Sequence, residues 1–152
     1  MRLKIGMKKE SEFIGISSDR QNHIIQVVRK MYSLAKKLGW SEEKAKEMFL
    51  LGLVHDCGYE FSTIQSEHAH IGGEILKKLG FRYWREVYEH GNPNADYESE
   101  ELKILNIADF TVSLNRQVIT PKDRVIDIGK RYGTDSIQYT DSEKLGKDLG
   151  LL

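Results

Sequence analysis

The sequence predicts an all-α fold, a compact single-domain bundle of about six helices, and two observations support this prediction. The 152-residue chain contains only two prolines, Pro93 and Pro121, so long segments lack the residue that breaks helices most strongly. Within these segments apolar residues recur every three or four positions, which is the period of one helix face. A chain of this length forms one domain more readily than two, so we expect residues 1–152 to be a single domain.

The first two predicted helices each begin at a capping residue and end at a glycine. The first is expected to begin at residues 18–19, to carry an apolar stripe and to end at Gly39. The second follows Ser41, a good N-cap, and has glutamates in its first turn, where they favour the helix dipole. We expect it to run to about Asp56 and to be ended by Gly58.

The rest of the chain continues the helical pattern. Thr120-Pro121 pairs an N-cap with a proline at the first helical position. The tail from residue 134 to 152 has a weaker pattern, in which Asp141 is a candidate cap for a last short helix. The four further main helices are expected over about residues 67–79, 82–90, 97–113 and 121–132.

Composition excludes several functional classes. The 23 Lys and Arg residues balance the 23 Asp and Glu residues, which argues against a nucleic-acid binder. The longest apolar run, residues 48–54, is far too short for a membrane span. Cys57 is the single cysteine and residues 1–13 lack a signal-peptide core, so we expect a reducing cytoplasmic location. A homodimer is compatible with the sequence, but nothing in it decides the oligomeric state.

Several polar residues lie in phase with the apolar faces of five predicted helices. His70 shows the contrast, because it shares its face with Glu74 and Lys77 and is expected in solvent or at the rim of a site. The inward-facing group consists of four histidines and two aspartates: His23, His55, Asp56, His68, His90 and Asp109.

These six side chains predict a metal site. A single buried histidine or aspartate is usually explained by a hydrogen bond or a helix cap, but six of them would each need a separate partner. One or two divalent cations would satisfy them together. Imidazole and carboxylate ligands suit iron, manganese, zinc, nickel or cobalt, and the lack of a cysteine set argues against a structural zinc site. A buried polar network without metal is the alternative.

The adjacent residues His55 and Asp56 can bind at one site only if they lie at the end of a helix. Neighbouring residues on a helix diverge by about 100°, so both side chains cannot reach one point from the middle of a helix. We expect this restriction to relax in the last turn, just before Gly58. The two oxygens of Asp56 are then able to bridge two metal ions.

The order of these residues resembles the HD superfamily of metal-dependent phosphohydrolases. The resemblance covers roughly residues 20–132 and implies an HD-domain-like helical fold. The segments that carry it are RQNHIIQVV around His23, LGLVHDCGYE around His55 and Asp56, EHAHIGGEIL around His68, EVYEHGN around His90 and LKILNIADF around Asp109.

The resemblance also implies two overlapping sets of metal ligands, similar to those of di-iron members that cleave diadenosine tetraphosphate. Tyr59 stands where some members have a lysine, and His90 stands alone where two consecutive histidines are common. The segment after residue 107 looks like the tail of small HD proteins of unassigned substrate. The two implied sets are His23, His55, Asp56 and Asp109, and Asp56, His68 and His90.

The function implied by the resemblance is hydrolysis of a nucleotide or another small phosphoester by a metal-activated water. We expect Asp56 to accept the proton of that water or to bridge the metals. Arg20 lies one turn before the first histidine and is expected to bind phosphate through its guanidinium fork, with Lys103 and Arg116 as further candidates. Two alternatives remain open: a catalytically silent module that binds metal and nucleotide as a sensor or partner-binding protein, and oxygenase-like use of a di-iron site.

Overall fold

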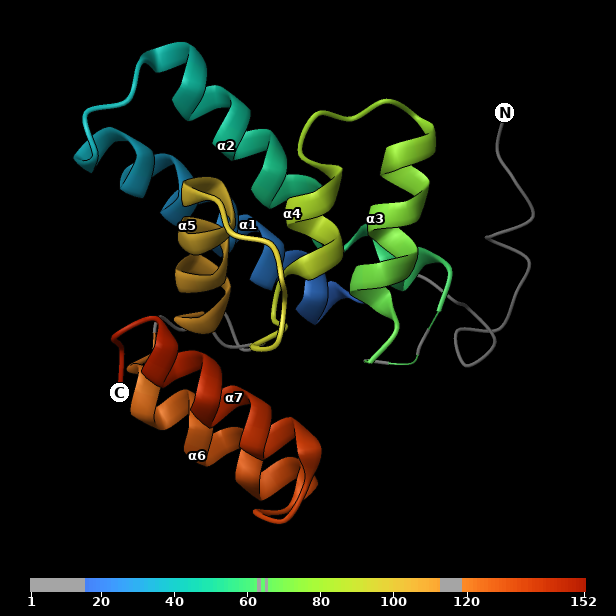
Figure 1. The fold of residues 1–152 in the computed structure, drawn as a ribbon, viewed down its shortest axis with the longest axis vertical. Coiled ribbons are helices and arrows are strands. Elements are labelled where there is room, and N and C mark those ends of the chain that lie inside the picture. The colour runs from blue at the N-terminus through green and yellow to red at the C-terminus, as the bar shows by residue number, and fades with distance from the viewer. Residues whose placement is uncertain (1–15, 63, 65, 113–118) are drawn as a thin grey trace.

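The computed structural model of the protein describes residues 16–62, 64, 66–112 and 119–152. Within these ranges the chain is all α-helical, as predicted, and no helix combines the length and apolar character of a membrane span. Figure 1 shows the helices in chain order. They are α1 (Ser18–Lys37), α2 (Glu42–Val54), the short 3-10 helix η3 (Cys57–Glu60), α3 (His68–Lys78), α4 (Trp84–Glu89), α5 (Glu100–Phe110), α6 (Pro121–Tyr132) and α7 (Ile137–Asp148).

Five of these helices begin after a serine or threonine whose hydroxyl accepts a hydrogen bond from a backbone N–H, which satisfies a donor left free at the helix start. The caps are Ser17 (α1), Ser41 (α2), Ser99 (α5), Thr120 (α6) and Ser136 (α7). The prediction that Asp141 caps the last helix is wrong. Asp141 lies inside α7. The helix is capped instead by Ser136, which has extended backbone and accepts a hydrogen bond from the N–H of Tyr139.

The end of α2 differs from the prediction in a way that places the His-Asp pair. The helix stops at Val54, His55 is its C-cap, and Asp56 leads into η3 with φ −101° and ψ 15°. Gly58 does not end α2. It packs so closely on α3 that a Cβ there would collide with the backbone carbonyl of His68, so its role is close approach.

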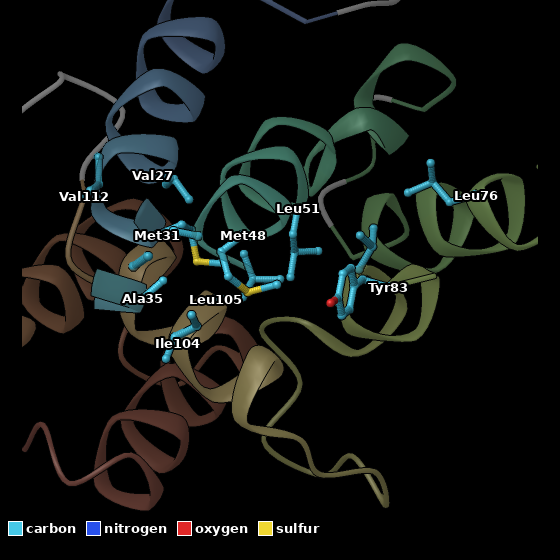
Figure 2. Packing of buried hydrophobic residues seen from close by; sticks show 13 residues of the cluster. Val27, Met31, Ala35, Met48, Leu51, Leu76, Tyr83, Ile104, Leu105 and Val112 are labelled. Atoms are coloured by element: carbon cyan, nitrogen blue, oxygen red, sulfur yellow. The ribbon is translucent and has the colours of Figure 1, made fainter. Parts of the chain in front are cut away.

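The main hydrophobic core lies between α1, α2 and α5 and extends to α3 and α4 (Figure 2). Its side chains follow the helical stripes expected from the sequence. Met31, Met48, Leu51 and Leu105 have no exposed surface. This core holds the ends of α2 and α5, which carry polar residues of the candidate site, in a fixed relation.

α3 and α4 pack against each other at a position that only glycine permits. A Cβ on Gly73 would lie 2.5 Å from the Cβ of Tyr88 and 2.6 Å from its Cα. Contacts that short force neighbouring atoms to move. Gly72 in turn faces the backbone N–H of Gly58, so both glycines make room for close packing.

α6 and α7 form a hairpin against the end of α5 (Figure 1). Phe110 of α5 packs in a second, smaller core with Val125 of α6 and Leu145 of α7. Lys144 of α7 donates hydrogen bonds to the segment Pro93–Asn94, between α4 and α5. The hairpin is therefore held both by α5 and by the segment between α4 and α5, near the candidate site.

Candidate metal centre

The structure brings together all six polar side chains that the sequence singles out. Five are buried, with exposed fractions from 0% for His23 to 9% for His68, and Asp109 is partly buried. They come from parts of the chain far apart in sequence. α1 supplies His23, the junction of α2 and η3 supplies His55 and Asp56, the first residue of α3 is His68, the C-cap of α4 is His90, and α5 supplies Asp109.

These side chains form two overlapping groups, each with ligand atoms within 4.8 Å of one another. Asp56 belongs to both groups. Its Oδ2 lies 3.3 Å from His55 Nε2 and 3.9 Å from His23 Nε2, while its Oδ1 lies 3.2 Å from His68 Nε2 and 3.4 Å from His90 Nε2. The two groups are His23, His55, Asp56 and Asp109, and Asp56, His68 and His90.

Two of the histidines have their ring orientation set by backbone carbonyls. The Nδ1 of His55 lies 2.6 Å from the carbonyl oxygen of Gly52, and the Nδ1 of His90 lies 2.6 Å from that of Val87. A carbonyl only accepts hydrogen bonds, so both Nδ1 atoms carry a proton and both Nε2 atoms face the cluster. Such a hydrogen bond on the far nitrogen is typical of histidines that ligate metals.

His55 gives the clearest sign that the cluster suits a cation. Its Nε2 is buried and has no hydrogen-bond partner among the described residues, although two carboxylates lie close by. A nitrogen lone pair facing carboxylate oxygens is repulsive unless a proton or a metal ion lies between them. The donor set of imidazoles and carboxylates fits a divalent transition metal.

Electrostatics in the metal-free cluster lead to the same conclusion. Burial opposes the charged form of His55, but the carboxylates of Asp56 and Asp109 outweigh it and raise the pKa of His55 to about 9. Burial also opposes the charge on Asp56 and Asp109, but the surrounding imidazoles hold the pKa of both carboxyls well below the usual range. Burial lowers the pKa of His90. The carboxylates thus stay charged, and a proton on His55 takes a place that a cation would otherwise fill.

Arg20 and Tyr59 complete the wall beside the cluster. Arg20 Nη1 lies 3.2 Å from Asp56 Oδ2, and its guanidinium lies 4.2 Å from the centre of the Tyr59 ring. Tyr59 stacks in turn on His68, with ring centres 4.3 Å apart and an angle of 14°. The sequence identified Arg20 but not this role of Tyr59, because a stack between η3, α1 and α3 leaves no local pattern.

A cleft of about 350 Å³ opens from the cluster. Its inner wall includes Arg20, Asp56 and Tyr59, and its outer wall is formed by α6 and α7. Sequence reasoning missed the outer wall, including Arg124 and Arg131. The signal was available, since these two arginines are seven positions apart on a predicted helix and therefore share a face.

The other candidates lie elsewhere. Lys103 is exposed and is not part of the cleft wall, and Arg116 lies outside the described residues. His70 is exposed at the rim, where it stacks on Tyr88 with ring centres 4.3 Å apart. Burial raises the pKa of the Cys57 thiol to about 11, which leaves it uncharged at neutral pH and a poor nucleophile.

Comparison with known proteins identifies the family. A model of the HD domain matches residues 20–114, a range that contains all six clustered side chains, Arg20 and Tyr59. The chain belongs to the HD domain family. HD domains bind divalent metals, and the family comprises metal-dependent phosphohydrolases. The hairpin of α6 and α7 lies beyond the matched range of this HD protein.

One curated relative is similar over a short stretch. The HD protein is 44% identical over 43 residues to 3′3′-cGAMP-specific phosphodiesterase 1 of Vibrio cholerae serotype O1 (strain ATCC 39315 / El Tor Inaba N16961). This stretch covers 28% of the chain and only 10% of that protein. No solved structure matches the chain significantly.

Proposed function

We propose that this HD protein is a metal-dependent phosphohydrolase that acts on a nucleotide or another small phosphoester. The observation that carries the proposal is the division of the Asp56 carboxylate between two groups of histidines, with one oxygen facing each group. This arrangement suits one or two divalent ions held side by side. Membership of the HD family and the phosphodiesterase activity named for the Vibrio cholerae relative support the reaction class and a nucleotide substrate.

The residues around the cluster have separate roles in this proposal. His23, His55 and Asp109 would hold a first ion, and His68 and His90 would hold a second, with Asp56 belonging to both groups. When bound, the ions would acidify water and neutralise charge on the phosphoryl oxygens. Because the pKa of Asp56 lies well below its usual range, Asp56 is a weak proton acceptor and would serve better as a metal ligand.

Arg20 is the proposed phosphate-binding residue. Its guanidinium is held by Asp56 and by the face of Tyr59, so little further ordering is needed when a phosphate arrives. Burial opposes its charge, but Asp56 and other nearby groups outweigh this and raise the pKa of Arg20. It therefore remains a charged donor, and a guanidinium binds two phosphate oxygens at once.

The first test is the metal content of protein purified without chelator, for wild type and for Asp56→Asn. The substitution keeps the shape of the side chain but removes its charge. We expect about one or two equivalents of a transition metal in the wild type and a large loss in the variant. The matched control is Asp96→Asn, which changes an exposed aspartate outside the cleft and should leave the metal content unchanged.

A screen of nucleotides and phosphoesters with the metal-loaded protein then separates the proposal from its alternative. Phosphate release that is lost in Asp56→Asn supports the hydrolase. Metal and nucleotide binding without turnover would favour the silent sensor or partner-binding module instead. A wild-type chain that binds no metal even after reloading with iron or manganese would contradict both, and the six side chains would then form a polar network.

A further inference from the structure

The cleft is larger than the candidate metal centre requires. Its volume of about 350 Å³ lies within the usual range for small-molecule sites, whereas the cluster contributes only Asp56, His68, His90 and Asp109 to its lining. The outer wall comes from the hairpin of α6 and α7, beyond the range that matches the HD domain. This wall is therefore not part of the matched HD domain. Its side chains help to determine which substrate fits the cleft.

One face of α6 supplies two arginines to the outer wall. Arg124, Ile128 and Arg131 all line the cleft and follow the four- and three-residue spacing of one helix face. Arg131 is partly neutralised, because its Nη2 lies 2.9 Å from the carboxylate of Asp127. α7 adds one carboxylate, Asp141, together with neutral polar groups.

Arg124 has few partners within the protein. It is partly buried, and its Nη1 makes one long hydrogen bond of 3.4 Å to the carbonyl of Val112. Among the described residues, no carboxylate lies within ion-pair distance of Arg124. Most of the five N–H donors of this guanidinium are thus available to a ligand, and partial burial strengthens what they bind.

The position of Arg124 is fixed relative to the metal centre. The same hairpin packs through Val125 and Leu145 on Phe110, which follows the clustered Asp109 directly in α5. The hydrogen bonds of Lys144 to the loop between α4 and α5 hold the other side of the hairpin. Arg124 therefore faces the cleft from a rigid wall, as a specific binding group does.

We propose that Arg124, with Arg131 at the rim, binds a second phosphate group of the substrate, separate from the phosphate at the metal centre. This inference rests on the proposed function for the first phosphate. The substrate class is then a nucleotide with two separated phosphate groups, such as a bisphosphate or a dinucleotide. An unpaired guanidinium suits a phosphate dianion or diester, and the neutral polar groups of α7 suit the sugar and base between the two phosphates.

The test compares the equilibrium binding of two probes to the metal-loaded protein by calorimetry at constant ionic strength. The probes are adenosine 5′-monophosphate and adenosine 3′,5′-bisphosphate. In the wild type we expect the bisphosphate to bind more tightly. Arg124→Gln should raise the Kd of the bisphosphate roughly tenfold, because a charged hydrogen bond is lost, and should leave that of the monophosphate nearly unchanged.

The matched control is Lys130→Gln, which removes the same charge from an exposed position on α6 outside the cleft wall. It should change both affinities by less than about twofold. Equal weakening of both probes by Arg124→Gln, equal effects of the two variants, or no effect at all would overturn the inference. Should Arg124→Gln not fold, Arg124→Lys replaces it as the test. Weaker binding of the bisphosphate alone would support two-point binding of phosphate by the Arg124 guanidinium, and unchanged binding would overturn the inference.

Binding and turnover separate this inference from the proposed function. Arg124-dependent binding of the bisphosphate without its hydrolysis leaves the second phosphate site standing and contradicts the hydrolase. Hydrolysis of monophosphates by a protein in which Arg124 affects neither probe supports the hydrolase and overturns the second site.

Discussion

Asp56 illustrates how much of the candidate site depends on one side chain. It is 1% exposed, carries a charge, and faces four imidazoles and a guanidinium. The backbone of Asp56 is no longer helical, so its carboxylate does not point in the direction that the next residue of a continuing helix would have. A buried charge is tolerated only when it is paired or bound to a cation, and here the pairing is shared among several elements.

We expect His55, the residue before Asp56, to make the stability of the metal-free protein depend on pH. The pKa of His55 is raised from its ordinary value of 6.5 to about 9 in the folded chain. Its stabilising contribution is therefore complete below pH 6.5 and is lost as the pH rises through 9. We expect the Tm of chelator-treated protein to fall over this interval in calorimetry.

The two carboxylates predict the opposite dependence of stability at acid pH, and bound metal should change the dependence at alkaline pH. The pKa of Asp56 and Asp109 is depressed, so their contribution is present at neutral pH and is lost as strongly acidic pH protonates them. A bound ion would replace the proton on His55, so the loaded protein should lose less stability at alkaline pH. A metal-free Tm that is flat from pH 6.5 to 9 would contradict the charge assignment.

Arg20 carries a prediction that separates substrate binding from metal binding. Arg20→Gln should lower kcat/KM for phosphoesters by about ten- to a hundredfold, because a charged donor to phosphate is lost. Its metal content should remain that of the wild type, since Arg20 is no ligand. Arg29→Gln, an exposed position on the same helix, is the control and should leave both quantities unchanged. Loss of metal in Arg20→Gln would show instead that Arg20 mainly maintains Asp56.

At the scale of elements, two close approaches set the position of the histidines. Gly58 lets η3 contact the start of α3, where His68 lies, and Gly73 lets α3 contact α4, which ends at His90. The hydroxyl caps define where the helices begin, but these glycines define how near they come. The separation of the Nε2 atoms of the two histidines, 3.2 Å, follows from that packing.

Gly58→Ala and Gly73→Ala should each lower the free energy of unfolding by about 2 kcal/mol or more, because the added methyl meets backbone atoms that cannot move freely. Urea denaturation measures the loss, and Gly58→Ala should also reduce metal content through His68. Gly80→Ala is the control. Its φ is +77° but no atom lies within 4 Å of the added Cβ, so only about 1 kcal/mol of backbone strain is expected. Equal losses at all three positions would contradict the packing argument.

At the scale of the whole molecule, the candidate metal centre joins separate parts of the fold. The main core connects α1, α2 and α5, and the smaller core connects α5 with the hairpin of α6 and α7. The clustered side chains come from α1, the junction of α2 and η3, α3, α4 and α5. A ligand that binds only this assembled arrangement stabilises the whole fold.

Removal of metal should therefore destabilise the protein as a unit. At a free metal concentration about a hundred times the Kd, binding stabilises the native state by about 2.7 kcal/mol. We expect a chelator to lower the Tm by several degrees and re-addition of metal to restore it. Asp56→Asn should show no response to either treatment. A chelator effect of equal size in Asp56→Asn would place the metal elsewhere.

The sequence is enough to predict the all-α fold, the main helices to within about one turn, and the six polar side chains of the candidate site. These follow from helical periodicity, since a polar residue in phase with an apolar stripe must face the interior whatever the partner helix is. Capping and glycine signals are local too, although the caps Ser17, Ser99 and Ser136 were not found.

Which atoms meet depends on how the helices pack and is visible only in the folded protein. The two oxygens of Asp56 face different histidine groups because α2 ends before Asp56. His68 comes close to this residue because Gly58 lacks a Cβ, which would collide with the His68 carbonyl. The stack of Arg20, Tyr59 and His68 and the placement of Arg124 over the cleft join segments far apart in sequence. Such contacts leave no periodic trace in a single chain, because they arise from how whole helices pack rather than from the preferences of neighbouring residues.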